Sequence, residues 1–264
     1  MTHKPIYKLF LSSMILLLIL ACNALAPVAT PPAMPSRIPP IATSAPLLSQ
    51  QLTMNGQTSE ETNQTPPFKI TAQTPQLTGS DEPRVAGFNQ RLNDLVKKEV
   101  DIWRQSFLQN NAPVVSNGST LDGTYTLISQ IGDLWSFKFD FNFYSDGAAH
   151  PGLYSITLNY DLAQGKELAL ADLFLPNANY LETISQYCIG ELSEQPGFEG
   201  PFADGAQPTK ENYRNWNITP DGLLITFDMY QVMPGASGPI QVLVPYSALR
   251  GLINPEGVVG QFAQ

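Results

Sequence analysis

Residues 134–144 alternate strictly between large apolar and polar side chains. The apolar positions are Trp135, Phe137, Phe139, Phe141 and Phe143, separated by Ser136, Lys138, Asp140 and Asn142. Because successive side chains of a strand point to opposite faces of a sheet, this period of two predicts a strand with one packed face and one wet face. A strand of this kind is typical of antiparallel sheets that are covered on a single face.

Helix and strand patterns follow one another along the rest of the chain. Residues 84–109 and 179–195 carry apolar side chains at three- and four-residue spacing, which predicts two amphipathic helices. Further strands are expected at residues 68–77, 124–132, 153–162, 215–219, 222–233 and 240–249. The order strand, helix, strands, helix, strands predicts an α+β fold with mostly antiparallel sheets, two packed amphipathic helices and no βαβ repeat.

The N-terminus has the pattern of a bacterial lipoprotein signal. Lys4 and Lys8 give a positive start, an apolar run follows, and Ala21 stands directly before Cys22. The run is shorter than the roughly 20 residues that span a bilayer comfortably. We expect a signal peptide over residues 1–21, a lipidated Cys22 and an extracytoplasmic protein held on the membrane by this lipid. An uncleaved membrane anchor is the alternative.

The segment after the signal has an unusual composition. Residues 23–67 hold nine of the 23 prolines, and most other residues there are Ala, Thr, Ser or Gln. Such a segment cannot bury enough apolar surface to offset the entropy lost on ordering it. We therefore expect a disordered tether over residues 22–67. Two small subdomains are expected to follow, at residues 68–130 and 131–264.

The chain is acidic. Removing Lys4 and Lys8 with the signal would leave 12 Lys and Arg against 23 Asp and Glu. A charge balance of this sign argues against nucleic-acid binding, which depends on neutralising phosphates. It favours cationic partners at long range.

Residues for metal or nucleophilic chemistry are scarce. The mature chain would hold one histidine, His150, and one cysteine besides Cys22, which is Cys188. A zinc site needs three or four such ligands in one place, and Cys188 lies on the apolar face of a predicted helix, as a buried thiol would. Ser237 lies in a glycine-rich segment that lacks the G-x-S-x-G pattern of a nucleophile elbow. We expect no metal, no cofactor and no catalytic residue.

Carboxylate pairs leave one enzymatic alternative open. Glycoside hydrolysis uses two Asp or Glu side chains that flank the scissile bond. The candidates, chosen by proximity in the sequence alone, are Asp140, Asp146, Asp161 and Asp172.

The segment around His150 reads as a turn between two strands. Asp146 and Gly147 begin it, and Pro151 and Gly152 end it. His150 would hold the hairpin through a hydrogen bond or would belong to a binding loop, together with residues 233–238 at the same end of the sheet. The candidate binding residues are Tyr144, Gly147, His150, Pro151, Tyr230 and Gly238. Half-buried strand packing is the alternative for the tyrosines.

Two longer stretches resemble a known extracytoplasmic module. Residues 143–174, "FYSDGAAHPGLYSITLNYDLAQGKELALADLF", resemble its pattern of a tyrosine, a glycine-rich turn with His-Pro, and a "DLF" segment. Residues 68–96 resemble the smaller domain that precedes it, with Phe88 and Asn89 at the start of a helix. The module occurs in lysozyme-sensing anti-sigma factor ectodomains of the RsiV type and in the non-catalytic region of PdaC-type peptidoglycan deacetylases. The resemblance covers about residues 68–253.

The resemblance implies a binding role. We expect a lipid-anchored module that recognises a cell-wall component such as peptidoglycan, or a cell-wall hydrolase such as lysozyme. The alternatives are a weak glycan-active enzyme and a structural envelope lipoprotein without a ligand. The chain departs from both relatives, because it has neither a sigma-binding segment nor a deacetylase domain, so we expect neither activity. The oligomeric state is left open.

Overall fold

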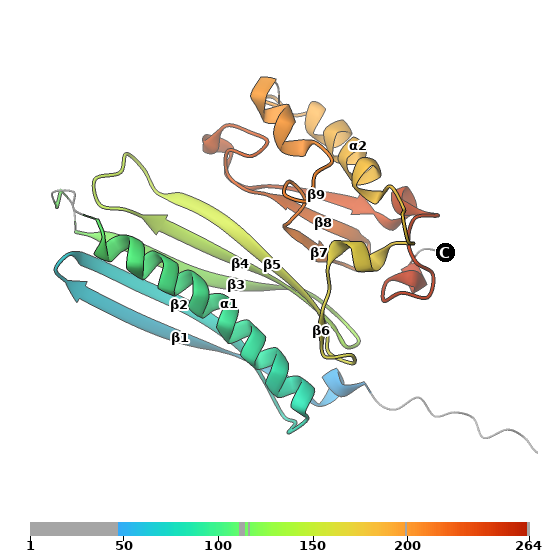
Figure 1. Cartoon of the computed structure of the whole chain (residues 1–264), viewed down its shortest axis with the longest axis horizontal. Coiled ribbons are helices and arrows are strands. Elements are labelled where there is room, and N and C mark those ends of the chain that lie inside the picture. Colours follow the sequence, from blue (N-terminus) through green and yellow to red (C-terminus); the bar gives the residue numbers. More distant parts are fainter. Residues whose placement is uncertain (1–46, 111–113, 116, 199, 263–264) are drawn as a thin grey trace, which may run out of the picture. The chain divides into compact units, whose positions relative to one another are not determined.

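Nine strands form two sheets in the computed structural model, which describes residues 47–110, 114–115, 117–198 and 200–262. The larger sheet has the order β1 (Thr53–Gln64), β2 (Pro67–Thr78), β3 (Ser119–Ile131), β4 (Leu134–Tyr144), β5 (Gly152–Asp161) and β6 (Lys166–Glu167). The smaller has the order β7 (Trp216–Ile218), β8 (Gly222–Phe227) and β9 (Ile240–Pro245). Two helices, α1 (Pro83–Leu108) and α2 (Tyr180–Ser193), complete the long elements (Figure 1). The predicted α+β class is confirmed.

The larger sheet is built around one parallel pair. β2 and β3 run parallel, with α1 as the crossover between them, and every other neighbouring pair is antiparallel. The sequence therefore has no βαβ repeat but does contain one βαβ unit, because a parallel pair needs a long crossover connection. Figure 1 shows α1 lying along one face of this sheet.

The alternating strand behaves as its pattern predicts. Trp135, Phe137, Phe139 and Phe141 of β4 are buried. Phe88 of α1 packs on Phe137 with ring centroids 6.0 Å apart, so this face of β4 lies against the helix. The neighbouring Asn89 extends the contact, since its amide donates to the Leu77 carbonyl and accepts from the Leu77 N–H, both at 2.8 Å. Asn89 thereby pairs with the end of β2 as another strand would.

The predicted tether is wrong at its C-terminal end. Residues 53–64 form β1, which pairs with β2 over its whole length, from Thr53 opposite Thr78 to Gln64 opposite Pro67. Most β1 side chains are exposed on both faces, so the strand carries no hydrophobic alternation. Backbone pairing holds it, and Arg104 of α1 forms an ion pair with Glu61. The predicted signal peptide, Cys22 and tether residues 22–46 lie outside the described residues.

The predicted subdomain boundary at residues 130 and 131 is also wrong. It falls inside the β3–β4 hairpin, whose strands pair from Thr120 opposite Tyr144 to Ile131 opposite Leu134. The buried side chains instead form one core between Phe68 and Leu162 and a second between Leu168 and Val259. In the second core, α2 contributes Ile184, Cys188 and Leu192.

Buried polar side chains join the two sheets. Ser136, Asn159 and Asn217 are each at most 2% exposed. Asn159 accepts from Ser136 Oγ at 2.6 Å and donates to the Trp216 carbonyl at 2.8 Å. Asn217 donates to Ser136 Oγ at 2.9 Å. This network fastens β7 to the face of β4 and β5 that α1 does not cover.

Within residues 47–262, apart from the undescribed gaps, no helix is both long and apolar enough to cross a bilayer.

Candidate functional site

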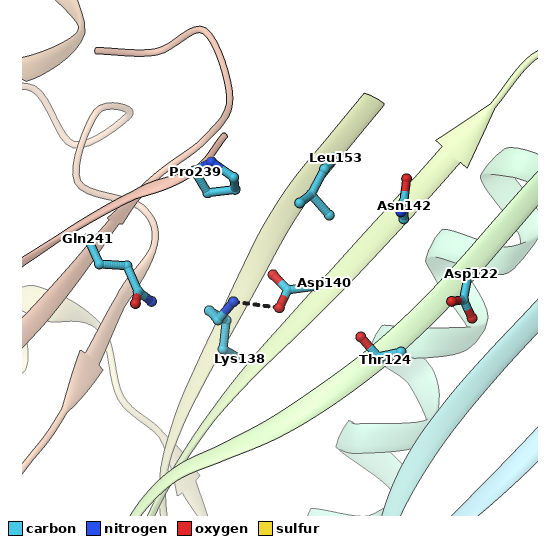
Figure 2. A pocket seen from close by; sticks show the side chains of 8 residues that line it. All are labelled: Asp122, Thr124, Lys138, Asp140, Asn142, Leu153, Pro239 and Gln241. Atoms are coloured by element: carbon cyan, nitrogen blue, oxygen red, sulfur yellow. Dashed lines mark hydrogen bonds and ion pairs between the residues drawn. The ribbon is translucent and has the colours of Figure 1, made fainter. Parts of the chain in front are cut away.

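The polar face of the larger sheet borders a groove of about 490 Å³. Its floor comes from three adjacent strands, and its other side comes from the segment that enters β9 (Figure 2). The lining residues are Asp122 and Thr124 of β3, Lys138, Asp140 and Asn142 of β4, Leu153 of β5, Pro239 directly before β9, and Gln241 of β9. The strand alternation that buries the phenylalanines under α1 therefore directs Lys138, Asp140 and Asn142 into the groove.

Hydrogen bonds hold the floor of the groove in place. Lys138 and Asp140 form an ion pair, drawn as the dashed line in Figure 2. Asp140 also accepts a hydrogen bond from Ser155 Oγ at 2.7 Å. The Ser155 backbone N–H donates to Asp228 Oδ1 at 2.9 Å, and Asp228 forms an ion pair with Arg214. The groove therefore has fixed charged groups backed by a second layer of polar contacts.

Other groups in the groove remain available to a ligand. Asp122 and Asn142 are exposed. They stand opposite each other on paired strands, so that a carboxylate and an amide lie next to each other. Leu153 and Pro239 add apolar surface. Directional hydrogen-bonding groups beside small apolar surfaces suit a neutral polar ligand that has both hydroxyl groups and carbon faces.

The structure brings His150 and Tyr230 together. Their rings lie 6.3 Å apart, and the Tyr230 hydroxyl is 3.4 Å from His150 Nε2. His150 Nδ1 is 2.9 Å from the carbonyl of Pro151. His150 thus contacts its own turn through Pro151 and the loop between β8 and β9 through Tyr230.

Tyr230 has a strained backbone. Its φ is +70°, a region that bulky residues rarely adopt, yet its side chain is 53% exposed. The ring lies against Gly235, where an added Cβ would come within 2.0 Å of it. The backbone strain persists although burial of the exposed side chain does not offset it. This marks Tyr230 as a candidate functional residue.

The other predicted binding residues are more dispersed. Gly147 and Gly238 have φ of +89° and +68° and supply turns that other residues would strain. Tyr144 ends β4, and within the described residues its ring contacts neither His150 nor Tyr230. Sequence reasoning missed every groove residue except Asp140, namely Asp122, Thr124, Lys138, Asn142, Leu153, Pro239 and Gln241. The polar positions of residues 136–142 were the available signal.

Two of the four candidate carboxylates, Asp140 and Asp161, lie too far apart to act as a pair. Asp140 pairs with Ser155 and Asp161 with Leu134, positions six residues apart along β4 and therefore about 20 Å apart. Glycosidases hold their two carboxyl groups within about 5–9.5 Å. Asp146 accepts from the Val115 N–H at 3.2 Å, and Asp161 accepts from Gln164 at 2.8 Å. The Asp161 contact lies within a turn, and the Asp146 contact joins the β4–β5 turn to the segment before β3.

Asp172 also has a local role. A hydrogen bond from Lys166 lowers the pKa of the Asp172 carboxyl, and the Ala169 backbone N–H contributes in the same direction. The pair fixes the short helix η2 (Leu170–Leu173). Within the described part of the chain, no cluster of three or more His, Cys, Asp or Glu side chains could hold a metal.

Part of the chain is similar to a known protein family. Residues 171–247 match DUF3298, a protein family of unknown function. The matched segment holds α2, the smaller sheet and Tyr230, and it supplies the groove residues Pro239 and Gln241. The remaining groove residues come from strands that precede it.

The chain is also similar to several curated proteins. The chain is 32% identical over 107 residues to the immunogenic protein MPT64 of Mycobacterium tuberculosis, which is 40% of this chain and 47% of that protein. It is 32% identical over 111 residues to an esterase of the same bacterium, covering 42% of this chain and 49% of the esterase. It is 30% identical over 113 residues to the peptidoglycan-N-acetylmuramic acid deacetylase PdaC of Bacillus subtilis, covering 42% of this chain and 24% of PdaC. The chain thus spans half or less of these relatives, and the predicted resemblance to PdaC is confirmed.

Two solved structures share the fold. A DUF3298-family protein of Bacteroides fragilis aligns with a TM-score of 0.59 at 15% identity, over 80% of this chain and 97% of that one. A DUF3298-family protein of Pseudomonas aeruginosa aligns with a TM-score of 0.54 at 17% identity, over 77% and 95%. At these identities the similarity establishes the fold alone.

The segment that matches DUF3298 contains the buried Cys188. Its side chain is 0% exposed, and burial raises the pKa of the thiol to about 12. Residues 45–264 form one compact folded unit. We expect this folded unit to react with a thiol reagent such as 5,5′-dithiobis(2-nitrobenzoate) at pH 8 at least a hundredfold more slowly than the same chain in denaturant. Equal rates in the two conditions would show that Cys188 is accessible.

Proposed function

We propose that this protein is a lipid-anchored, extracytoplasmic binding module whose groove recognises a cell-wall glycan. The observation that carries the proposal is the groove itself, in which Asp122, Asp140 and Asn142 face Gln241 and Pro239. Carboxylates and amides can accept from and donate to sugar hydroxyls, and Leu153 and Pro239 can pack against the carbon face of a sugar ring. The relative PdaC is named as a peptidoglycan deacetylase, which supports a cell-wall ligand.

The N-terminal sequence supports the location. The positive start, apolar run and Ala21-Cys22 pair are those of a lipoprotein signal. The proline-rich residues between Cys22 and the first described residue would let the folded unit extend from the membrane towards the wall.

The groove proposal predicts a loss of binding in one double variant. Asp122→Ala with Asn142→Ala removes two exposed polar groups, and we expect about a tenfold weaker affinity for soluble peptidoglycan fragments, since each lost hydrogen bond contributes about 0.5–1.5 kcal/mol. Isothermal titration calorimetry measures it. The matched control, Asn93→Ala with Asp94→Ala, makes the same changes on exposed α1 positions and should leave the affinity unchanged. If the two double variants bind the fragments with equal affinity, the ligand does not bind in the groove.

The strained tyrosine gives a second test. In Gly235→Ala, the new methyl group would occupy the place of the Tyr230 ring, which must swing away. We expect several-fold weaker glycan binding and a melting temperature within about 2 °C of the wild type, because the displaced ring is half exposed. The control is Gly190→Ala, a helical position where a methyl group would meet nothing within 4 Å. If binding survives in Gly235→Ala, Tyr230 is not a contact residue.

A second candidate ligand is a cationic cell-wall hydrolase such as lysozyme. The surface formed by α2 and the segment after it carries five acidic residues: Glu182, Glu191, Glu194, Asp204 and Glu211. In the described part of the chain, none of the five forms an ion pair. Such a surface would attract a positively charged protein, and salt would weaken the complex. Lysozyme binding that is lost in Glu191→Gln with Glu194→Gln, but kept in the groove double variant, would favour this candidate.

A further inference from the structure

A second cavity lies on the smaller-sheet side of the molecule, between η2, the first turn of α2 and the turn that precedes β7. Its volume is about 210 Å³, and it shares no lining residue with the groove. Its large apolar lining residues belong to or pack against the core that contains Cys188, whereas the floor of the groove belongs to the larger sheet. A ligand here would be independent of the glycan proposed above.

The walls of this cavity are mostly carbon. Leu170 and Leu181 line it together with the rings of Tyr180, Tyr213 and Trp216. The Tyr213 hydroxyl is occupied, because it donates to the Ala206 carbonyl at 2.7 Å. The Tyr180 ring stacks on Phe174 with centroids 4.4 Å apart. The aromatic side chains therefore have fixed positions, and their rings form an apolar lining.

Two cations complete the lining. Arg214 is neutralised by its ion pair with Asp228. Lys210 is exposed and, among the described residues, takes part in no ion pair. Residues 164–264 contain four Lys and Arg against eleven Asp and Glu. An uncompensated lysine beside an apolar cavity is therefore an exception in an acidic region.

The turn that carries Lys210 is held in place. The Asn212 side-chain amide donates to the carbonyls of Asp204 at 2.9 Å and Gln207 at 3.0 Å. The Asn212 carbonyl accepts from Gln231 Nε2 at 2.9 Å. The site is therefore preformed, and binding would cost little conformational entropy.

We propose that this cavity binds a short-chain aliphatic carboxylate, with the tail among the rings and the carboxylate at Lys210. The size of the cavity limits the ligand. Since one water molecule occupies about 30 Å³ of liquid, the cavity has room for about seven non-hydrogen atoms. Hexanoate fits this limit if its carboxylate remains at the mouth.

The experiment is a titration of the ¹⁵N-labelled folded unit, residues 45–264, with hexanoate, followed by NMR. We expect saturable shifts confined to residues around the cavity, with a dissociation constant on the order of millimolar for so small a ligand. Hexanol and hexylammonium should bind at least threefold more weakly. Equal binding of hexanol, shifts spread over the whole surface, or no saturation would overturn the proposal.

Two variants separate charge from shape. Lys210→Gln should weaken hexanoate binding threefold to tenfold, whereas the matched Lys98→Gln, an exposed lysine of α1 that also forms no described ion pair, should not change it. Ala171→Phe, at the edge of the cavity, should abolish binding, while Ala163→Phe at an exposed position outside the cavity should retain it. Equal losses of hexanoate affinity in Lys210→Gln and Lys98→Gln would show that the effect comes from net charge and not from Lys210 at the cavity. Because the readout is hexanoate and not glycan, failure here leaves the groove proposal unaffected.

Discussion

Replacing Asn159 by alanine is expected to lower the free energy of unfolding by about 3 kcal/mol, since a buried polar network is left incomplete. The variant loses a bond to Ser136 Oγ, one to the Ile218 N–H and one to the Trp216 carbonyl. The Ile218 N–H keeps Ser136 Oγ at 3.1 Å, but the Trp216 carbonyl loses its described side-chain partner. Guanidinium unfolding of residues 45–264, followed by tryptophan fluorescence, measures the change.

The control for this prediction lies on the same face of the neighbouring strand. Asn142→Ala removes an exposed amide for which no internal hydrogen bond is described, and it should change the unfolding free energy by no more than about 0.5 kcal/mol. A similar loss in both variants would mean that the buried network does not stabilise the junction of the sheets. We also expect Asn159→Ala to weaken glycan binding, because the network positions β7 against the sheet that forms the groove floor.

Phe88→Ala is expected to cost more, about 3–5 kcal/mol, as a large buried aromatic side chain is lost and a cavity remains. Phe88 is 0% exposed. Its ring stacks on Tyr160 at 4.3 Å and lies 6.0 Å from Phe137 and 6.4 Å from Trp135. The same denaturation experiment applies. On the outer side of α1, Ile102 is 50% exposed, so Ile102→Ala should cost less than about 1 kcal/mol. Comparable losses at the two positions would contradict the placement of α1.

The packed face of the larger sheet was predictable because its signal is local. The alternation of residues 134–144 correctly gives the buried phenylalanines of β4, and the spacing in residues 84–109 gives the helix that covers them. Both patterns arise from side chains that contact one core, so each can be recognised within its own segment.

The environment of the polar face of β4 was only partly predictable, because segments distant in the sequence cover part of that face. Ser136 alternates with phenylalanine exactly as Asn142 does, yet Ser136 is buried by β7, about 80 residues later in the chain, while Asn142 lines the groove. Nothing in residues 134–144 distinguishes the two positions. β1 was missed for a related reason, since it is stabilised by pairing with β2 and its own polar side chains stay exposed.

The candidate site shows the same division. Small-residue turns suggested that the His150 loop and residues 233–238 share one end of the sheet, and the 3.4 Å contact between His150 and Tyr230 agrees with that suggestion. The strain at Tyr230 could not be foreseen, because a positive φ at tyrosine goes against the preference of the residue itself. The groove could not be predicted, because it depends on the register of three strands and on the approach of β9. No single segment of the sequence carries this information.

The measurement that tests the central claim most directly is an NMR titration of the ¹⁵N-labelled folded unit with soluble peptidoglycan fragments. The account predicts saturable binding, with the largest shifts at Asp122, Asn142 and Gln241 and at Tyr230. In Asp122→Ala with Asn142→Ala the same shifts should need about tenfold more ligand to saturate, whereas Asn93→Ala with Asp94→Ala should titrate as the wild type does. The absence of saturable binding, or saturable shifts that leave the groove unperturbed, would contradict it.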